Sequence, residues 1–173
     1  MADVVWVGCN RPETHAGIYK RTRSLGLETT PFQASELRNG AVLDMLCSSQ
    51  VDWVILAGFL LRIPEAMVGH FKGRMVNIHP ALLPDFGGKG MYGMHVHQAV
   101  KAAGCVESGM TVHWVTSAYD EGDVIFQASC ALEPEDEPEQ IAQKVAQLEH
   151  RYYARAIDAL IQDAVAQTSL QHG

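Results

Sequence analysis

Short apolar runs recur along the chain with the length of strands in a buried sheet. The run VVWVG near the start is continuous, which is typical of a strand covered on both faces. The run GMTVHWV alternates, which indicates a strand with one face less deeply buried. The strands expected from these patterns are Val4–Gly8, Val51–Phe59, Met75–Ile78, Gly109–Val115 and Asp123–Leu132.

Segments with apolar residues at helical spacing lie between these strands and after them. Two prolines, Pro64 and Pro138, stand where a helix would begin. The expected helices are Gly17–Ser24, Gly40–Ser48, Pro64–Phe71, His95–Ala103 and a long one from Pro138 to about Ala166. The alternation predicts one α/β domain over residues 1–173, with an open, mostly parallel twisted sheet flanked by helices.

Composition narrows the class of protein. The 173 residues suit a single domain, and a formal net charge of -7 argues against nucleic acid as a partner, because few cations are available to neutralise phosphates. The apolar run at the start is far shorter than the roughly 20 residues that cross a membrane. Four scattered cysteines without a CxxC pair suit reduced thiols. We therefore expect a cytoplasmic protein without a membrane segment.

Three polar residues stand where strands are expected to end. Asn77 and His79 are two residues apart, so an extended chain would point both side chains to one side, and Asp120 follows the Gly109–Val115 strand. Taken singly, they suit a turn former, a packed histidine before Pro80 and an Asp-x-Gly turn. Together, an amide, an imidazole and a carboxylate can stabilise an oxyanion and move a proton.

The ordered motifs resemble a known family. Asn77-Ile-His-Pro-Ala-Leu-Leu-Pro84, followed by the aspartate of Tyr119-Asp120-Glu-Gly122, is similar to the N10-formyltetrahydrofolate-dependent formyltransferases. The longer stretches NIHPALLPDFGGKGMYGMHVHQAV and DEGDVIFQASCALEPEDEPEQIAQKVAQLEHRYY are most similar to glycinamide ribonucleotide transformylases. The resemblance covers roughly the whole chain after Val4 and implies their Rossmann-like fold.

The resemblance implies a reaction and roles for three residues. The amine of glycinamide ribonucleotide would attack the formyl carbon on N10 of 10-formyltetrahydrofolate, the cosubstrate, and no metal would be required. Asn77 and a protonated His79 would donate hydrogen bonds to the oxyanion of the tetrahedral intermediate. Asp120 would raise the His79 pKa by its opposite charge and help relay a proton to the leaving nitrogen.

The resemblance also implies binding residues for both substrates. The amine-bearing substrate would contact Glu149, although a solvated helix face is an equally good interpretation of that residue. Leu60, Leu61 and Ile63 taken alone favour ordinary core packing. The residues expected to bind the reduced folate are Leu60, Leu61, Arg62, Ile63, Asn77, Thr116, Ser117, Ala118, Tyr119 and Asp120.

Other histidines allow a different site. His95 and His97, with His79 and Asp120, could be drawn as a metal site. The two lie at the start of a helix, where residues two apart diverge around the axis, so a shared metal is not expected. The family has a similar His-x-His without a metal. We expect His97 to help shape the site and His113, inside a strand, to be a satisfied structural histidine.

The start of the chain departs from the family. Family members begin with a strand and a Gly-Ser-Asn loop that binds the ribonucleotide phosphate at a helix start. Here VVWVGCN leads into RPETHAG and matches the family's second strand and helix. The first strand–loop–helix unit is therefore expected to be missing, which would leave two sheet edges unpaired.

Three explanations of that departure stay open. In the first, which we favour because the catalytic and folate motifs are intact, the natural protein begins upstream of Met1. In the second, the substrate is held without a phosphate loop. In the third, Val4–Asn10 takes the central place in a shortened sheet.

The function also leaves alternatives open. The GGKGMYG loop favours the transformylase, whereas the missing phosphate loop favours a formyltetrahydrofolate deformylase or a sugar-nucleotide N-formyltransferase. A non-catalytic folate-binding paralogue or an inactive fragment belongs to another class. The sequence does not predict an oligomeric state.

Overall fold

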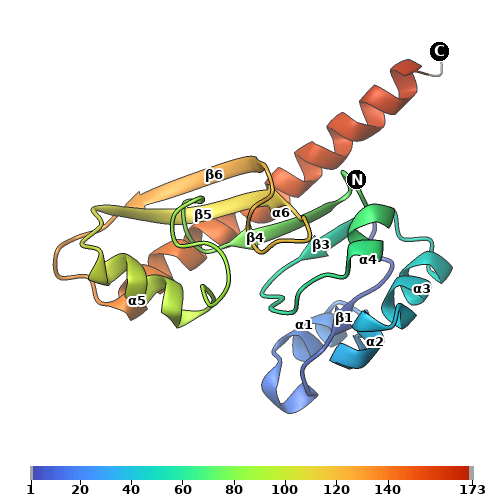
Figure 1. The fold of residues 1–173 in the computed structure, drawn as a ribbon, viewed down its shortest axis with the longest axis horizontal. Coiled ribbons are helices and arrows are strands. Elements are labelled where there is room, and N and C mark those ends of the chain that lie inside the picture. The colour runs from blue at the N-terminus through green and yellow to red at the C-terminus, as the bar shows by residue number, and fades with distance from the viewer. Residues whose placement is uncertain (1, 172–173) are drawn as a thin grey trace.

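The computed structural model describes residues 2–171 and has an α/β fold, as expected. Helices flank a mixed sheet (Figure 1). The elements in chain order are β1 (Gly8–Cys9), η1 (Glu13–His15), α1 (Ile18–Ser24), β2 (Thr30–Pro31), α2 (Ala34–Arg38), α3 (Ala41–Ser48), β3 (Val54–Leu56), α4 (Glu65–His70), β4 (Met75–His79), α5 (Met94–Ala102), β5 (Glu107–Trp114), β6 (Val124–Ala131) and α6 (Pro138–Gln171).

The strands form two separate sheets. The main sheet has the order β3-β4-β5-β6, and β1 pairs only with β2 in a second, two-stranded sheet. In the main sheet β3 and β4 are parallel, whereas β4–β5 and β5–β6 are antiparallel. The expectation of a mostly parallel sheet is therefore wrong for the main sheet. The short connection from β5 to β6 permits only an antiparallel pair, because a parallel pair needs a long crossover.

The expected strand Val4–Gly8 is also wrong in extent. Only Gly8 and Cys9 pair, with Thr30 and Pro31, and Val4 and Val5 are 61% and 60% exposed. An apolar run becomes a strand covered on both faces only where neighbouring strands pair with it. Within residues 2–171, β1 lies outside the main sheet, so Val4–Asn10 does not take its central place, and β1 and β3 each have an unpaired edge.

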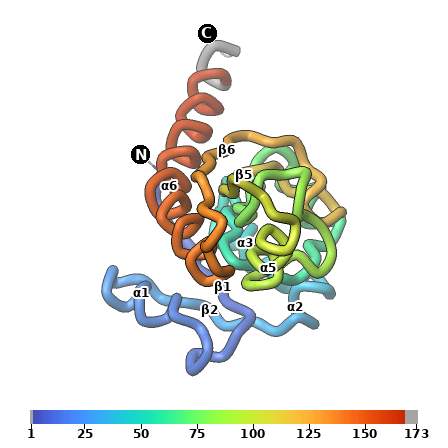
Figure 2. The backbone as a smooth tube through the Cα atoms, turned by 90° about the vertical axis from the view of Figure 1, so that its left-hand side faces the viewer, coloured from blue at the N-terminus to red at the C-terminus, as the bar shows by residue number. Residues whose placement is uncertain are grey.

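The helices agree better with the sequence patterns. Helices α3, α4, α5 and α6 begin within one residue of the expected positions, and Pro64 and Pro138 stand at the starts of α4 and α6. Helix α6 continues to Gln171, past the expected end near Ala166, and its last turns extend beyond the rest of the chain (Figure 2). The patterns did not predict β2 or the five-residue α2, which are too short to show a period. None of the helices in residues 2–171 is long and apolar enough to cross a membrane.

Two apolar clusters fill the two sides of the main sheet. Met75 belongs to a cluster with residues of α2, α3, β3 and α4, whereas its neighbour Val76 belongs to a cluster with residues of α5, β5 and α6. Side chains alternate along a strand, so Asn77 and His79 share the face of Met75, and Ile78 shares the face of Val76. Helix α6 covers the latter face (Figure 1). The polar residues of β4 therefore lie on the face away from α6.

Candidate active site

A row of polar side chains crosses the face of the main sheet away from α6. In the antiparallel register Asn77 of β4 pairs with His113 of β5, and His79 pairs with Thr111. Thr111 in turn pairs with Gln127 of β6. Directly opposite residues bring their side chains together across a strand pair. The same-side placement expected for Asn77 and His79 is confirmed.

Asp120 reaches this row from the loop that joins β5 to β6. Its Oδ2 lies 3.5 Å from Nδ1 of His79, and its Oδ1 lies 3.5 Å from Nε2 of His113. The backbone N–H of Gly88 donates to Oδ2 at 2.9 Å. Asp120 has a φ of 56°, a left-handed conformation that aspartate tolerates better than most residues. The structure thus brings the three residues proposed from sequence into one cluster.

The backbone fixes the proton on His79. Nε2 lies 2.8 Å from the carbonyl oxygen of Phe86, and a carbonyl only accepts, so Nε2 carries a hydrogen. Nδ1, which faces Asp120, is then bare in the neutral ring and protonated in the imidazolium. Both ring nitrogens face protein groups, and only 3% of the residue is exposed. A direct hydrogen bond from His79 to a substrate therefore requires the Phe86 carbonyl to move away.

Burial and charge oppose each other in the titration of the His79–Asp120 pair. Burial lowers the pKa of His79 below its ordinary value and outweighs the opposite effects of Asp120 and of the Phe86 carbonyl. The sequence-based expectation that the His79 pKa is raised is therefore wrong in its net direction, although Asp120 acts as expected. Burial raises the pKa of Asp120, but the charge of His79 and the hydrogen bond from the Gly88 N–H are among the interactions that together outweigh burial and leave the pKa lowered.

Buried hydrogen bonds hold the loop after His79 against β5 and β6. The fully buried hydroxyl of Thr111 donates to the Ala81 carbonyl at 2.6 Å and accepts from the Leu83 N–H at 3.0 Å. The side-chain amide of Gln127 donates to that hydroxyl and to the Leu83 carbonyl, both at 2.9 Å. This loop carries Phe86 and Gly88, so these bonds fix the partners of His79 and Asp120.

A cavity of about 540 Å³ lies beside Asp120. Tyr119 and Asp120 are the expected folate-binding residues that line it. It is also lined by Leu83, Pro84, Gly87, Gly88, Glu121, Gly122, Asp123 and Val124.

The other expected folate-binding residues do not line this cavity. Arg62 joins the two expected segments, because its Nε donates to the Ser117 carbonyl at 2.9 Å. Ile63 is buried in the apolar cluster with Met75, Leu61 packs against that cluster, and Leu60 is 39% exposed. Core packing, the alternative interpretation, thus describes Ile63 and Leu61. Thr116 pairs locally with the backbone of Ala118.

Glu149 lies on α6 one turn before Tyr153. The Tyr153 hydroxyl donates to the Leu56 carbonyl at 2.6 Å, and Leu56 is the β3 residue that pairs with Asn77. Burial raises the pKa of Glu149 above its ordinary value. Glu149 is half-buried and near Tyr153, so it is less exposed than a residue on a fully solvated helix face.

His97 and His113 differ from each other in their surroundings. His97 is 6% exposed, and its Nδ1 has no hydrogen-bond partner in the described part of the chain. Burial, and to a lesser degree the charge of His79, lower the pKa of His97 below its ordinary value. Residues 2–171 hold no group of three or more His, Cys, Asp or Glu side chains arranged for a metal. His113 is satisfied, as expected, but its contacts to Asn77 and Asp120 were missed.

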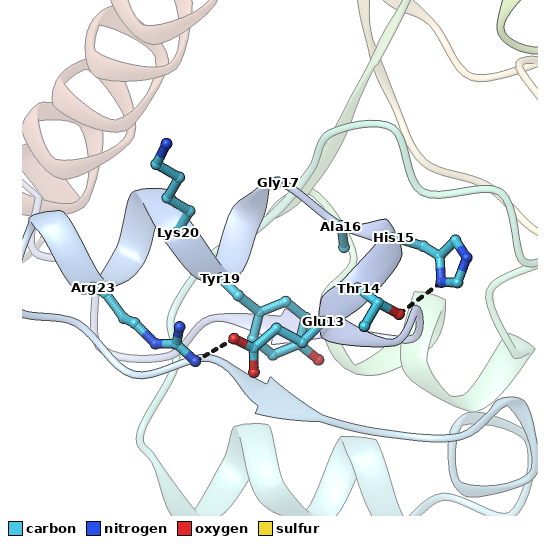
Figure 3. A pocket seen from close by; sticks show the side chains of 8 residues that line it. All are labelled: Glu13, Thr14, His15, Ala16, Gly17, Tyr19, Lys20 and Arg23. Atoms are coloured by element: carbon cyan, nitrogen blue, oxygen red, sulfur yellow. Dashed lines mark hydrogen bonds and ion pairs between the residues drawn. The ribbon is translucent and has the colours of Figure 1, made fainter.

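A second cavity of about 320 Å³ lies in the N-terminal part and shares no residue with this cluster. Figure 3 shows residues of η1 and α1 around it, with Arg23 paired to Glu13 and Lys20 pointing away from that pair. Most of its polar side chains are exposed, and the hydroxyl of the buried Tyr19 donates to the Arg11 carbonyl at 3.2 Å.

Comparisons with known proteins identify the family of the chain. Residues 2–157 match the family model described as formyl transferase. The chain belongs to the formyl transferase family. The fold brings together Asn77, His79 and Asp120, the three residues expected from the sequence to be catalytic.

Relatives of this formyl transferase share most of its length. The chloroplastic phosphoribosylglycinamide formyltransferase of Arabidopsis thaliana is 36% identical over 94% of the chain and 57% of the relative. That of Vigna unguiculata is 36% identical over 94% of the chain and 53% of the relative. The crystal structure of phosphoribosylglycinamide formyltransferase from Anaplasma phagocytophilum has a TM-score of 0.83 at 30% identity, covering 93% of this chain and 76% of that one. The chain thus spans about half the length of the curated relatives it matches.

Proposed function

We propose that the chain transfers the formyl group of 10-formyltetrahydrofolate to the amine of glycinamide ribonucleotide, a reaction of purine synthesis. The observation that carries the proposal is the convergence of Asn77, His79 and Asp120 in one cluster, of which Asp120 lines the 540 Å³ cavity. An amide donor, a buried imidazole and a carboxylate can together stabilise the oxyanion of an acyl transfer and move the proton between the two nitrogens. The names of the relatives support the choice of substrates.

The proposed chemistry balances through one proton. The amine nitrogen bonds to the formyl carbon, the carbonyl oxygen becomes an oxyanion, and the bond from carbon to N10 then breaks. The amine loses one proton and N10 gains one. Asp120 lines the cavity and His79 lies 3.5 Å behind it, so this pair is placed to carry that proton. Asn77 donates an amide hydrogen to the oxyanion.

The binding residues are part of the same proposal. Tyr119 and Asp120 contact the reduced folate in the cavity, while Arg62 holds the Thr116–Asp120 loop in place through Ser117. Glu149, half-buried and near the end of β3, contacts the amine-bearing substrate. We also propose that the protein is cytoplasmic. The proposed reaction involves no metal, nucleic acid or membrane.

Product analysis tests the proposed function. The 173-residue chain is incubated with 10-formyltetrahydrofolate and with or without glycinamide ribonucleotide, and both tetrahydrofolate and the formylated amine are quantified by mass spectrometry. We expect one formylated amine for each tetrahydrofolate, with turnover dependent on the amine. Equal amounts of formate and tetrahydrofolate without the amine would instead indicate a deformylase. Folate binding without either product would indicate a non-catalytic protein.

A further inference from the structure

The backbone of β5 fixes which nitrogen of His113 carries hydrogen. Nδ1 lies 2.9 Å from the carbonyl oxygen of Trp114, an atom that can only accept. His113 therefore carries its hydrogen on Nδ1, and in the neutral ring Nε2 is a bare acceptor. The residue is 2% exposed, so water does not compete for that nitrogen.

This tautomer determines how the amide of Asn77 is turned. Nε2 of His113 lies 3.2 Å from the Asn77 side-chain nitrogen. The reverse orientation would place the amide oxygen against a bare ring nitrogen, so two acceptors would face each other. An NH2 group has two hydrogens, and His113 uses one of them. The second N–H is then held in a fixed direction.

We propose that His113 is a positioning residue that holds the Asn77 amide with its nitrogen towards the reacting oxyanion. Oxyanion donors are effective when they are oriented before charge develops, so a fixed N–H stabilises the transition state more than a freely rotating amide does. The inference deepens the proposed function and rests on it for the identity of the oxyanion.

A competing contact makes the inference specific. Nε2 of His113 also faces Oδ1 of Asp120 at 3.5 Å, and the other ionisable group facing that carboxylate is His79. If His113 were protonated, Nε2–H would donate to Asp120 and the Asn77 amide would lose its acceptor. The Asn77 amide is therefore held by His113 when the His113 ring is neutral and released when the ring is protonated.

Two substitutions of His113 distinguish the effect of its hydrogen-bond acceptor from the effect of its size. His113→Gln keeps an acceptor of similar reach, whereas His113→Phe keeps the ring and removes the acceptor. We expect His113→Phe to lower kcat by about 10–100-fold with little change in the folate KM. His113→Gln should retain most of the kcat of the unaltered chain. His15→Gln, at an exposed histidine of η1, is the matched control with unchanged kcat. Equal losses in the Phe and Gln variants would overturn the inference.

A double-mutant cycle tests whether His113 acts through Asn77. If it does, His113→Phe should lower kcat by no more than about 3-fold in an Asn77→Ala background. The full loss in that background would show that His113 acts on another group, and the inference would be wrong.

A spectroscopic measurement does not depend on activity. Side-chain nitrogen NMR of the 15N-labelled chain at pH 7.5, with His113 identified by its absence in His113→Gln, reports which ring nitrogen carries hydrogen. We expect Nδ1 protonated and Nε2 bare, and an Asn77 NH2 signal that moves in His113→Phe. A protonated Nε2 would overturn the inference even if formyl transfer is observed. The expected tautomer without formyl transfer would contradict the proposed function alone.

Discussion

Nδ1 of His79 and Oδ2 of Asp120 lie 3.5 Å apart, although one residue ends β4 and the other lies in the loop after β5. The side chains are only 4% and 11% exposed, so their interaction is weakly screened by water. Burial nevertheless lowers the pKa of His79. Asp120 therefore opposes burial and limits how far the His79 pKa falls below its ordinary value.

Removing that charge should lower the His79 pKa further. Asp120→Asn keeps the shape of the side chain and tolerates the left-handed backbone, but it does not attract the imidazolium. NMR titration of the His79 ring should show a lower pKa in Asp120→Asn than in the unaltered chain. The exposed Asp85→Asn serves as the control and should leave it unchanged. A His79 pKa that rises or stays constant in Asp120→Asn would contradict the assigned electrostatics.

The lowered histidine pKa values should make the fold sensitive to mild acid. An unfolded histidine binds a proton near pH 6.5, whereas His79 and His97 in the folded chain resist it until lower pH. The unfolded state then binds more protons, so stability falls as pH falls from about 6.5 towards the folded pKa values. Between pH 7.5 and 5.5, the unfolding free energy of His97→Leu should fall by less than that of the unaltered chain, as measured by urea titrations. An identical loss would show that His97 is not one of the responsible groups.

Two buried hydroxyls on β5 offer a matched test of the loop anchor. Thr111 makes hydrogen bonds to Ala81, Leu83 and Gln127, whereas the buried Ser108 hydroxyl has no partner in residues 2–171. Thr111→Val should cost about 2–4 kcal/mol of unfolding free energy because it leaves buried polar groups unpaired. Ser108→Ala should cost less than about 1 kcal/mol. Denaturant unfolding measures both, and similar costs would mean that the loop is held by other contacts.

Gly122 fixes the path of the loop that carries Asp120. A Cβ atom there would lie 1.7 Å from the Trp114 carbonyl oxygen, a contact with backbone that only a shift of the loop relieves. Gly122→Ala should therefore reduce formyl transfer strongly by displacing Asp120. Gly69→Ala is the control, since a Cβ at that position in α4 meets nothing within 4 Å. Rates of tetrahydrofolate formation measure the difference, and an active Gly122→Ala chain would show that Asp120 tolerates displacement.

The local patterns in the sequence predicted what depends on nearby residues. The spacing of Asn77 and His79 placed both on one face, because alternation along a strand needs no information from other elements. Pro64 and Pro138 indicated the starts of α4 and α6, because the preference of proline for the first turn of a helix is also local. The motif similarity added Asp120, which no spacing rule connects to β4.

Features set by distant partners were not predictable in the same way. Val4–Gly8 has the composition of a buried strand, but whether it is one depends on strands that pair with it. The contact of His113 with Asn77 follows from the antiparallel register of β4 and β5, which the sequence did not give. Alternating polar residues in GMTVHWV were the available signal, since Thr111 and His113 share one face of β5.

The kinetics and folate affinity of Asn77→Ala test the proposed function most directly. Both the turnover of 10-formyltetrahydrofolate with glycinamide ribonucleotide and the Kd for the folate are measured in the unaltered chain and the variant. We predict that turnover falls by about 100–1000-fold, because one oxyanion donor is lost, while the Kd changes by less than about 3-fold. Equal losses of turnover and affinity would show that Asn77 is a structural residue and would contradict the proposed site.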